Sequence, residues 1–131
     1  MKNSILIVDD SEDTRELFKA TLEAEGFGVM AAKDGPQALD ILAEHGGFSL
    51  MLLDLRMPTM SGFEVLQEMK RRDLGCTTPV MVVSAVDELP HLKLPENVIG
   101  TLKKPFFYPE LIFKIKSLLE PEPSREAEAR A

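Results

Sequence analysis

Short apolar runs alternate with longer amphipathic segments along the chain. Three of the runs are apolar on both faces and lie at residues 4–8, 50–53 and 80–83. Runs of this kind predict strands that are buried on both faces of a parallel sheet. Two weaker runs, 27–31 and 98–102, each contain a glycine and therefore predict edge strands.

Four segments carry apolar residues at helical spacing, and they lie at 12–25, 36–44, 61–72 and 108–119. Gly26 and Gly46 follow the first two segments as stop signals. Pro36 and Pro109 occupy first-turn positions of the second and fourth segments, and a Ser-Gly-Phe-Glu capping box starts the third. The alternation predicts an α/β fold, in which a doubly wound parallel sheet is covered by helices on both faces.

Two stretches depart from this alternation. Residues 87–97 contain Pro90 and Pro95, and a proline inside a helix costs about 3 kcal/mol. We therefore expect a fourth helix that is short or irregular, with at most one turn. Residues 121–131 lack a strong apolar stripe and predict a flexible tail or linker, so the expected domain covers residues 1–120.

Composition narrows the class of protein. The 131 residues are 44% hydrophobic and 28% charged, with a net charge of −7, which argues against nucleic-acid binding by this domain. No apolar run approaches the roughly 20 residues of a membrane span, and the N-terminus is not a signal peptide, so we expect a cytoplasmic protein. The single cysteine, Cys76, excludes an intramolecular disulfide, and we expect it to be half-buried.

Polar residues stand where the predicted strands end. The first strand runs into Asp9-Asp10, the third into Asp54, the fourth into Ser84 and the fifth into Lys103-Lys104-Pro105. Ligands of open α/β sheets bind in the crevice beyond the carboxyl ends of the strands. We therefore expect these residues to converge on one site, although they are far apart in sequence.

Three carboxylates in one crevice repel one another, by roughly 4 kcal/mol for two charges 4 Å apart at a dielectric of 20. Lys104 can offset one of the negative charges, and a hard cation such as Mg²⁺ would naturally balance the rest. Mg²⁺ with a carboxylate, a hydroxyl and an ammonium group is suited to handling a phosphoryl group. A strand-end aspartate can itself be the nucleophile and become an aspartyl phosphate.

Four motifs in this order resemble the receiver domains of two-component response regulators, and they are VDD at 8–10, DLRMP at 54–58, Ser84-Ala85 and KKPF at 103–106. The resemblance covers about residues 4–120. It implies a flavodoxin-like, five-stranded sheet with strand order 2-1-3-4-5. The ranking of the runs agrees independently, because the first, third and fourth runs look central and the other two look like edges.

The resemblance also implies a role for each site residue. Asp54 would be the phosphoacceptor. Asp10 and Asp54 would bind Mg²⁺ through their side chains and Arg56 through its backbone carbonyl, while Asp9 would act mainly through metal-bound water. Ser84 would hydrogen-bond the phosphoryl group, small Ala85 would leave it access, and Lys104 would pair with it, aimed by a cis peptide bond before Pro105.

The expected function is a phosphorylation-dependent signalling switch. It would accept a phosphoryl group from a sensor histidine kinase or a phosphotransfer protein, and it would catalyse only its own phosphorylation and dephosphorylation. An effector domain or a partner protein would read the signal, and we expect a monomer or weak dimer. Whether the chain stands alone or belongs to a larger regulator stays open at this point.

Two other functions compete with this one, and single residues have simpler interpretations. Asp9-Asp10 alone could cap a helix, and Asp54 alone could be a solvated charge. A phosphorylation-independent interaction module would keep the fold, but the complete acidic set argues against it. A Mg²⁺-dependent phosphohydrolase that uses an aspartyl phosphate typically has a second aspartate two residues after the nucleophile, where this chain has Arg56.

The sequence departs from the family at one position of the fifth strand. Receivers commonly have an aromatic residue three positions before the strand-end lysine, where this chain has Thr101. The segment from Ser84 to Lys104 is also about two residues shorter than is usual in receivers, and it contains Pro90 and Pro95, so we expect residues 86–97 to form an irregular, mobile loop. Any dimer or partner contact would then involve the first helix, the last helix or the Phe106-Phe107 step instead.

Overall fold

The computed structural model describes residues 3–84 and 94–119. Its elements follow one another as β1 (Ser4–Val8), α1 (Glu12–Ala24), β2 (Gly28–Ala32), α2 (Gly35–His45), β3 (Leu50–Asp54), α3 (Gly62–Arg72), β4 (Val80–Ser84), β5 (Val98–Lys103) and α4 (Tyr108–Leu119). The five strands form one parallel sheet in the order β2-β1-β3-β4-β5. The α/β fold, the parallel sheet and its strand order are confirmed.

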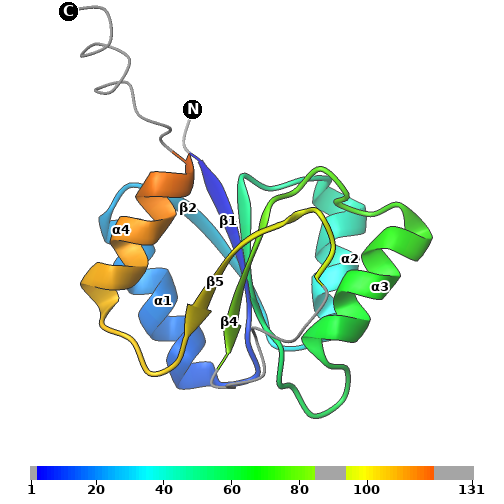
Figure 1. The fold of residues 1–131 in the computed structure, drawn as a ribbon, viewed down its shortest axis with the longest axis horizontal. Coiled ribbons are helices and arrows are strands. Elements are labelled where there is room, and N and C mark those ends of the chain that lie inside the picture. The colour runs from blue at the N-terminus through cyan, green and yellow to red at the C-terminus, as the bar shows by residue number, and fades with distance from the viewer. Residues whose placement is uncertain (1–2, 85–93, 120–131) are drawn as a thin grey trace, which may run out of the picture.

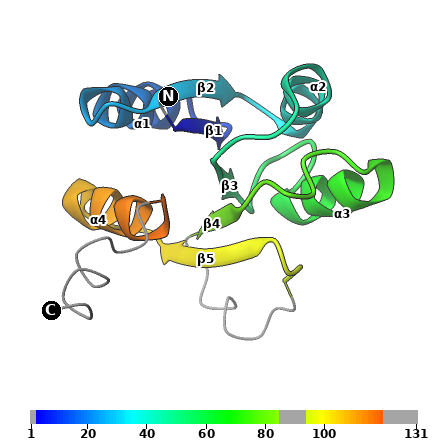
Figure 2. The same ribbon diagram turned by 90° about the horizontal axis from the view of Figure 1, so that it is seen from above.

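Helices cover both faces of the sheet (Figures 1 and 2). α1 and α4 lie on one face, and α2 and α3 lie on the other. Each face has its own apolar cluster, one around Phe18, Leu22 and Ile115 and one around Leu39, Val65 and Met69. β3 and β4 are buried at every position, which is why the sequence shows them as unbroken apolar runs.

The helices begin where short polar side chains can satisfy free backbone N–H groups. Ser11 accepts a hydrogen bond from the Thr14 N–H at the start of α1, and Asp34 accepts one from the Gln37 N–H at the start of α2. At α3, the Ser61 side chain accepts from the Glu64 N–H and the Glu64 carboxylate accepts from the Ser61 N–H, so the predicted capping box is present.

Several boundaries differ from the sequence-based prediction. β3 and β4 each run one residue further than their apolar runs, because the backbone pairing continues to the polar residues Asp54 and Ser84. β2 begins one residue later than predicted. Cys76 is exposed rather than half-buried, because it lies in the turn between α3 and β4.

Three predictions fall wholly or mostly outside the described residues. They are the short or irregular fourth helix within residues 87–97, the role of Ala85, and the tail at residues 121–131. Residues 94–97 are described, and they form coil and a turn that leads into β5.

β5 reaches its place at the sheet edge through a register shift. Val80 pairs with Val98, but Met81 pairs with Gly100, so β5 has one extra residue there. After the shift, Ser84 lies opposite Lys103, and the Lys104 N–H donates to the Ser84 carbonyl at 2.7 Å. The extra residue thereby brings Lys104 to the carboxyl end of β4.

Candidate functional site

Three aspartates meet at the carboxyl ends of β1 and β3, toward the bottom of Figure 1. One carboxylate oxygen from each of Asp9, Asp10 and Asp54 lies within 4.8 Å of the others. Asp9 and Asp54 are only 2% and 6% exposed, whereas Asp10 is exposed. Two of the three carboxylates are therefore largely shielded from water, which makes their mutual repulsion costly.

Asp54 lies at the centre of this cluster, at the end of the central strand β3. Its Oδ1 accepts a hydrogen bond from the Arg56 N–H at 3.1 Å, and its Oδ2 lies 3.6 Å from the Lys104 Nζ. Burial raises the pKa of the Asp54 carboxyl above its ordinary value, although the Arg56 N–H and Lys104 act in the opposite direction. The cluster therefore holds Asp54 in a position where added positive charge is favourable.

Asp9 is fixed by several contacts. The Ser11 N–H donates to Asp9 Oδ1 at 2.9 Å, and the Lys104 Nζ lies 3.4 Å from Asp9 Oδ2. Arg15 Nη1 donates to the Asp9 backbone carbonyl at 2.8 Å. Lys104 thus bridges the two buried carboxylates, Asp9 and Asp54.

Lys104 lies in a short segment between β5 and α4. The peptide bond between Lys104 and Pro105 is cis, as the resemblance to receiver domains implied. Next to it, the rings of Phe18, Phe106 and Tyr108 pack against one another, with centroids 5.7 to 5.8 Å apart. This aromatic cluster ties the Lys104 segment to α1, whereas Phe107 is 81% exposed.

The start of α3 lies close against the carboxyl end of β3. A Cβ atom added to Gly62 would lie 2.5 Å from the Asp54 carbonyl oxygen and 2.8 Å from the Leu55 Cα. Only glycine allows this approach. Gly62 therefore lets the loop from residue 55 to residue 61 fold tightly beside Asp54.

The donor set matches a hard divalent cation. Carboxylate and backbone carbonyl oxygens are the ligands that Mg²⁺ prefers, and it usually binds through one or two carboxylates. The cluster offers three carboxylates in reach of one another, and Lys104 lies beside two of them. These residues fit Mg²⁺ by their chemistry and by the charge left uncompensated.

A family model described as the response regulator receiver domain matches residues 5–116. The chain is a response regulator receiver domain. An uncharacterized transcriptional regulatory protein of Bacillus subtilis, YkoG, is 39% identical over 121 residues, which cover 90% of this chain and 51% of that protein. The receiver therefore spans about half the length of the curated relatives it matches.

Solved receiver structures share this fold. The response regulator TrrA from Thermotoga maritima, in complex with Mg²⁺-BeF, has a TM-score of 0.76 and 32% identity, covering 91% of this chain and all of that one. The receiver domain of a Pseudomonas aeruginosa PAO1 sensor histidine kinase has a TM-score of 0.77 and 25% identity, covering 92% of this chain and 99% of that one. It has a magnesium ion coordinated in its active-site cleft.

The predicted site residues of the receiver lie as the topology requires. Asp9, Asp10, Asp54 and Lys104 converge, and buried Ser84 ends the strand next to β3. The Arg56 side chain is exposed and its N–H is directed to Asp54. Sequence reasoning missed Arg15, whose only signal was its position in the second turn of the helix that follows Asp10.

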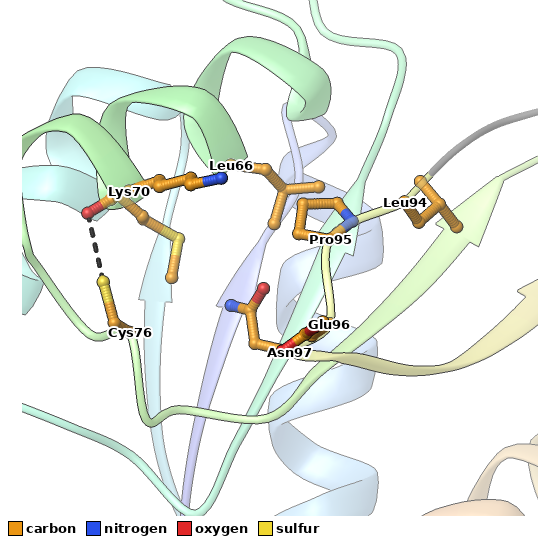
Figure 3. A pocket seen from close by; sticks show the side chains of 8 residues that line it. Leu66, Lys70, Cys76, Leu94, Pro95, Glu96 and Asn97 are labelled. Atoms are coloured by element: carbon orange, nitrogen blue, oxygen red, sulfur yellow. Dashed lines mark hydrogen bonds between the residues drawn. The ribbon is translucent and has the colours of Figure 1, made fainter.

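The receiver also has a hollow of about 440 Å³ (Figure 3). It lies between α3 and the segment before β5, at the amino ends of β4 and β5, and is lined by Leu66, Met69, Lys70, Cys76, Leu94, Pro95, Glu96 and Asn97. The Cys76 thiol donates to the Met69 carbonyl at 3.4 Å. Within the described part of the chain, no helix is long and apolar enough to span a membrane.

Proposed function

We propose that this receiver is a phosphorylation-dependent switch with Asp54 as its phosphoacceptor. The supporting observation is the meeting of Asp54 with Asp9 and Asp10 within 4.8 Å, beside Lys104. The phosphoryl donor is a phosphohistidine on a sensor histidine kinase or a phosphotransfer protein. An effector domain or a partner protein reads the result, in line with relatives that are about twice as long and include transcriptional regulatory proteins.

Transfer of the phosphoryl group forms one bond and breaks another. A carboxylate oxygen of Asp54 attacks phosphorus, the P–O bond forms, and the P–N bond to the imidazole breaks as the imidazole nitrogen takes a proton. Ser84 donates a hydrogen bond to a phosphoryl oxygen, and Lys104 moves its pairing from Asp54 to the phosphoryl group. Water later attacks phosphorus, which returns Asp54 as a carboxylate and releases inorganic phosphate.

Asp10 and Asp54 would hold the cation through their carboxylates and Arg56 would hold it through its backbone carbonyl, while Asp9 would act mainly through water. Bound Mg²⁺ supplies positive charge that neutralises the carboxylates and the phosphoryl oxygens. Burial of Asp9 and Asp54 makes that charge more effective than it would be in water.

The test is a mass measurement after incubation with acetyl phosphate and Mg²⁺. The wild type and Asp40→Asn, which removes an exposed aspartate on α2, should each gain one phosphoryl group. Asp54→Asn should gain none, and omission of Mg²⁺ should abolish labelling. Equal labelling of Asp54→Asn would reject the assignment.

The same experiment separates the competing functions. A phosphorylation-independent module would show no mass gain in any variant. A phosphohydrolase would release phosphate from an external phosphoester through many turnovers, whereas the switch is labelled once and then slowly loses the label. Arg56, in place of a second aspartate, favours the switch.

We also propose that residues 1–120 form the receiver and that residues 121–131 form a tail or linker. The family match ends at residue 116, and α4 ends at Leu119. Limited trypsin digestion should cleave at Arg125 and Arg130 well before any site within residues 3–84. Early cleavage within that range would contradict this division.

A further inference from the structure

Arg15 reaches back from α1 to the loop that carries the two N-terminal aspartates. Its Nη1 donates to the Asp9 backbone carbonyl at 2.8 Å, in a partly buried position. That carbonyl belongs to the peptide group between Asp9 and Asp10. We propose that Arg15 is a positioning residue, which fixes this peptide plane so that the Asp10 carboxylate faces Asp54. The inference rests on the proposed Mg²⁺ site.

Asp9 is anchored without Arg15, whereas Asp10 is not. The Asp9 N–H donates to the Ala32 carbonyl at 3.2 Å, and its carboxylate is held by the Ser11 N–H and by Lys104. Asp10 is exposed, so packing does not set the direction of its side chain. The orientation of the peptide group that precedes Asp10 sets that direction, and Arg15 holds this peptide group.

A guanidinium is well suited to this task. A hydrogen bond from a charged donor is roughly twice as strong as one between neutral groups. Arg15 is only half-exposed on the second turn of α1, and the first turn of that helix is itself fastened by the Ser11 cap. The donor is therefore attached to a rigid element, as an outer contact of a metal site needs to be.

The sign of the effect on Mg²⁺ binding separates positioning from simple electrostatics. Removing a positive charge near a cation site would, by electrostatics alone, tighten Mg²⁺ binding. Loss of positioning instead weakens it, and losing such an outer contact typically costs about 10- to 100-fold in metal affinity. A weaker affinity in a variant that has lost a positive charge can therefore not arise from charge.

The experiment measures the Mg²⁺ Kd by calorimetry for the full chain at fixed pH and salt, with Tm measured in chelator. The variants are Arg15→Gln, Arg15→Lys and the control Lys19→Gln, which removes an exposed cation one turn further along α1. We expect Arg15→Gln to bind about tenfold more weakly or worse, with an unchanged Tm in chelator. Arg15→Lys should lie between Arg15→Gln and the wild type, and Lys19→Gln should match the wild type.

Three results would overturn the inference. One is an Arg15→Gln affinity that is unchanged or tighter while the wild type binds Mg²⁺. Another is an Arg15→Gln variant that is unfolded or much less stable in chelator, because Arg15 would then serve the fold. A wild type that binds no Mg²⁺ would overturn the proposed metal site itself, and this inference with it.

Discussion

Strand β3 contains two regions in which burial has opposite effects on stability. Its first four residues are apolar and buried between α1 and α4 on one side and α2 and α3 on the other. Its last residue, Asp54, is nearly as buried but is a carboxylate beside two others. The same backbone thus continues from a region that stabilises the fold to one that costs stability.

The two regions of β3 therefore contribute to the stability of the receiver in opposite ways. Burial of an aliphatic side chain contributes about 1.5–3 kcal/mol, and the strand interiors are made almost entirely of such side chains. At the carboxyl ends, burial raises the pKa of Asp54 because the charged form is disfavoured there. Substitutions in the two regions should therefore change the free energy of unfolding by different amounts and even in opposite directions.

The largest effect is expected in the strand interior. Leu52→Ala removes a side chain that is 1% exposed and belongs to the cluster of Phe18 and Ile115. Such truncations cost about 2–5 kcal/mol, from lost burial and the remaining cavity. Urea unfolding of the wild type and variant measures the difference. A loss well under 1 kcal/mol would mean that the interior does not carry the stability assigned to it here.

Gly62→Ala tests the boundary between the two regions. The added methyl group would meet the backbone of Asp54 and Leu55, which cannot move aside as a flexible side chain could. Overpacking of this kind costs about 1–3 kcal/mol. Asp54 is also displaced, so the variant should be labelled more slowly by acetyl phosphate. Ala43→Gly, on the exposed surface of α2, is the control for a change of one methyl group, and its labelling should be normal.

Mg²⁺ should act only on the carboxyl ends. A ligand that binds the native state alone, at ten times its Kd, adds about 1.4 kcal/mol to the free energy of unfolding. Thermal melts with Mg²⁺ and with chelator measure this gain. Asp10→Asn should lose most of it, and Asp40→Asn should keep it. An equal shift in both variants would place the cation elsewhere.

Asp54→Asn should stabilise the receiver at neutral pH, in contrast to Leu52→Ala. The raised pKa means that the folded state binds a proton more tightly than the unfolded state does. Wild-type stability therefore falls as pH rises from 3.8 through the raised pKa, and the neutral variant escapes this loss. We expect Asp54→Asn to have a higher free energy of unfolding than the wild type at pH 7, because the buried charge is gone. The gain should vanish below pH 3.8. Stabilisation that persists there would contradict this cause.

The smallest effect is expected away from both regions. Glu68, on the surface of α3, accepts hydrogen bonds from Arg71 and Arg72, and the Arg71 contact lowers the pKa of its carboxyl to about 2. Its stabilising contribution is present above its ordinary pKa of 4.5 and is lost as pH falls through about 2. Glu68→Gln should lower Tm slightly at neutral pH, and high salt should remove the difference because exposed pairs are screened. A large, salt-resistant loss would be unexpected.

Much of the fold could be predicted because burial leaves a direct trace in the sequence. β1, β3 and β4 are buried on both faces, and their apolar runs therefore identified them as the central strands. The meeting of Asp9, Asp10, Asp54 and Lys104 followed from the rule that parallel strands end at one edge of the sheet. The roles of these residues in phosphoryl transfer and metal binding stay predictions.

Other features depend on three-dimensional placement and leave no such trace. The contact of Arg15 with the Asp9 carbonyl needs the angle between β1 and α1. The exposure of Cys76 follows from the turn after Asp73, which ends α3 in a left-handed conformation. β5 has an extra residue where its pairing with β4 shifts register. No local sequence pattern predicts this shift.

The packing of α4 against α1 also has a consequence for the order of events during synthesis. Leu111 and Ile115 complete the cluster that contains Phe18 and Leu22, although the two helices lie at opposite ends of the described sequence. At typical rates of translation, α4 is synthesised on the order of ten seconds after α1. During that interval Phe18 and Leu22 of α1 lack their contacts with Leu111 and Ile115, and the aspartates lack Lys104. Folding of the nascent receiver can therefore finish only when its last helix has left the ribosome.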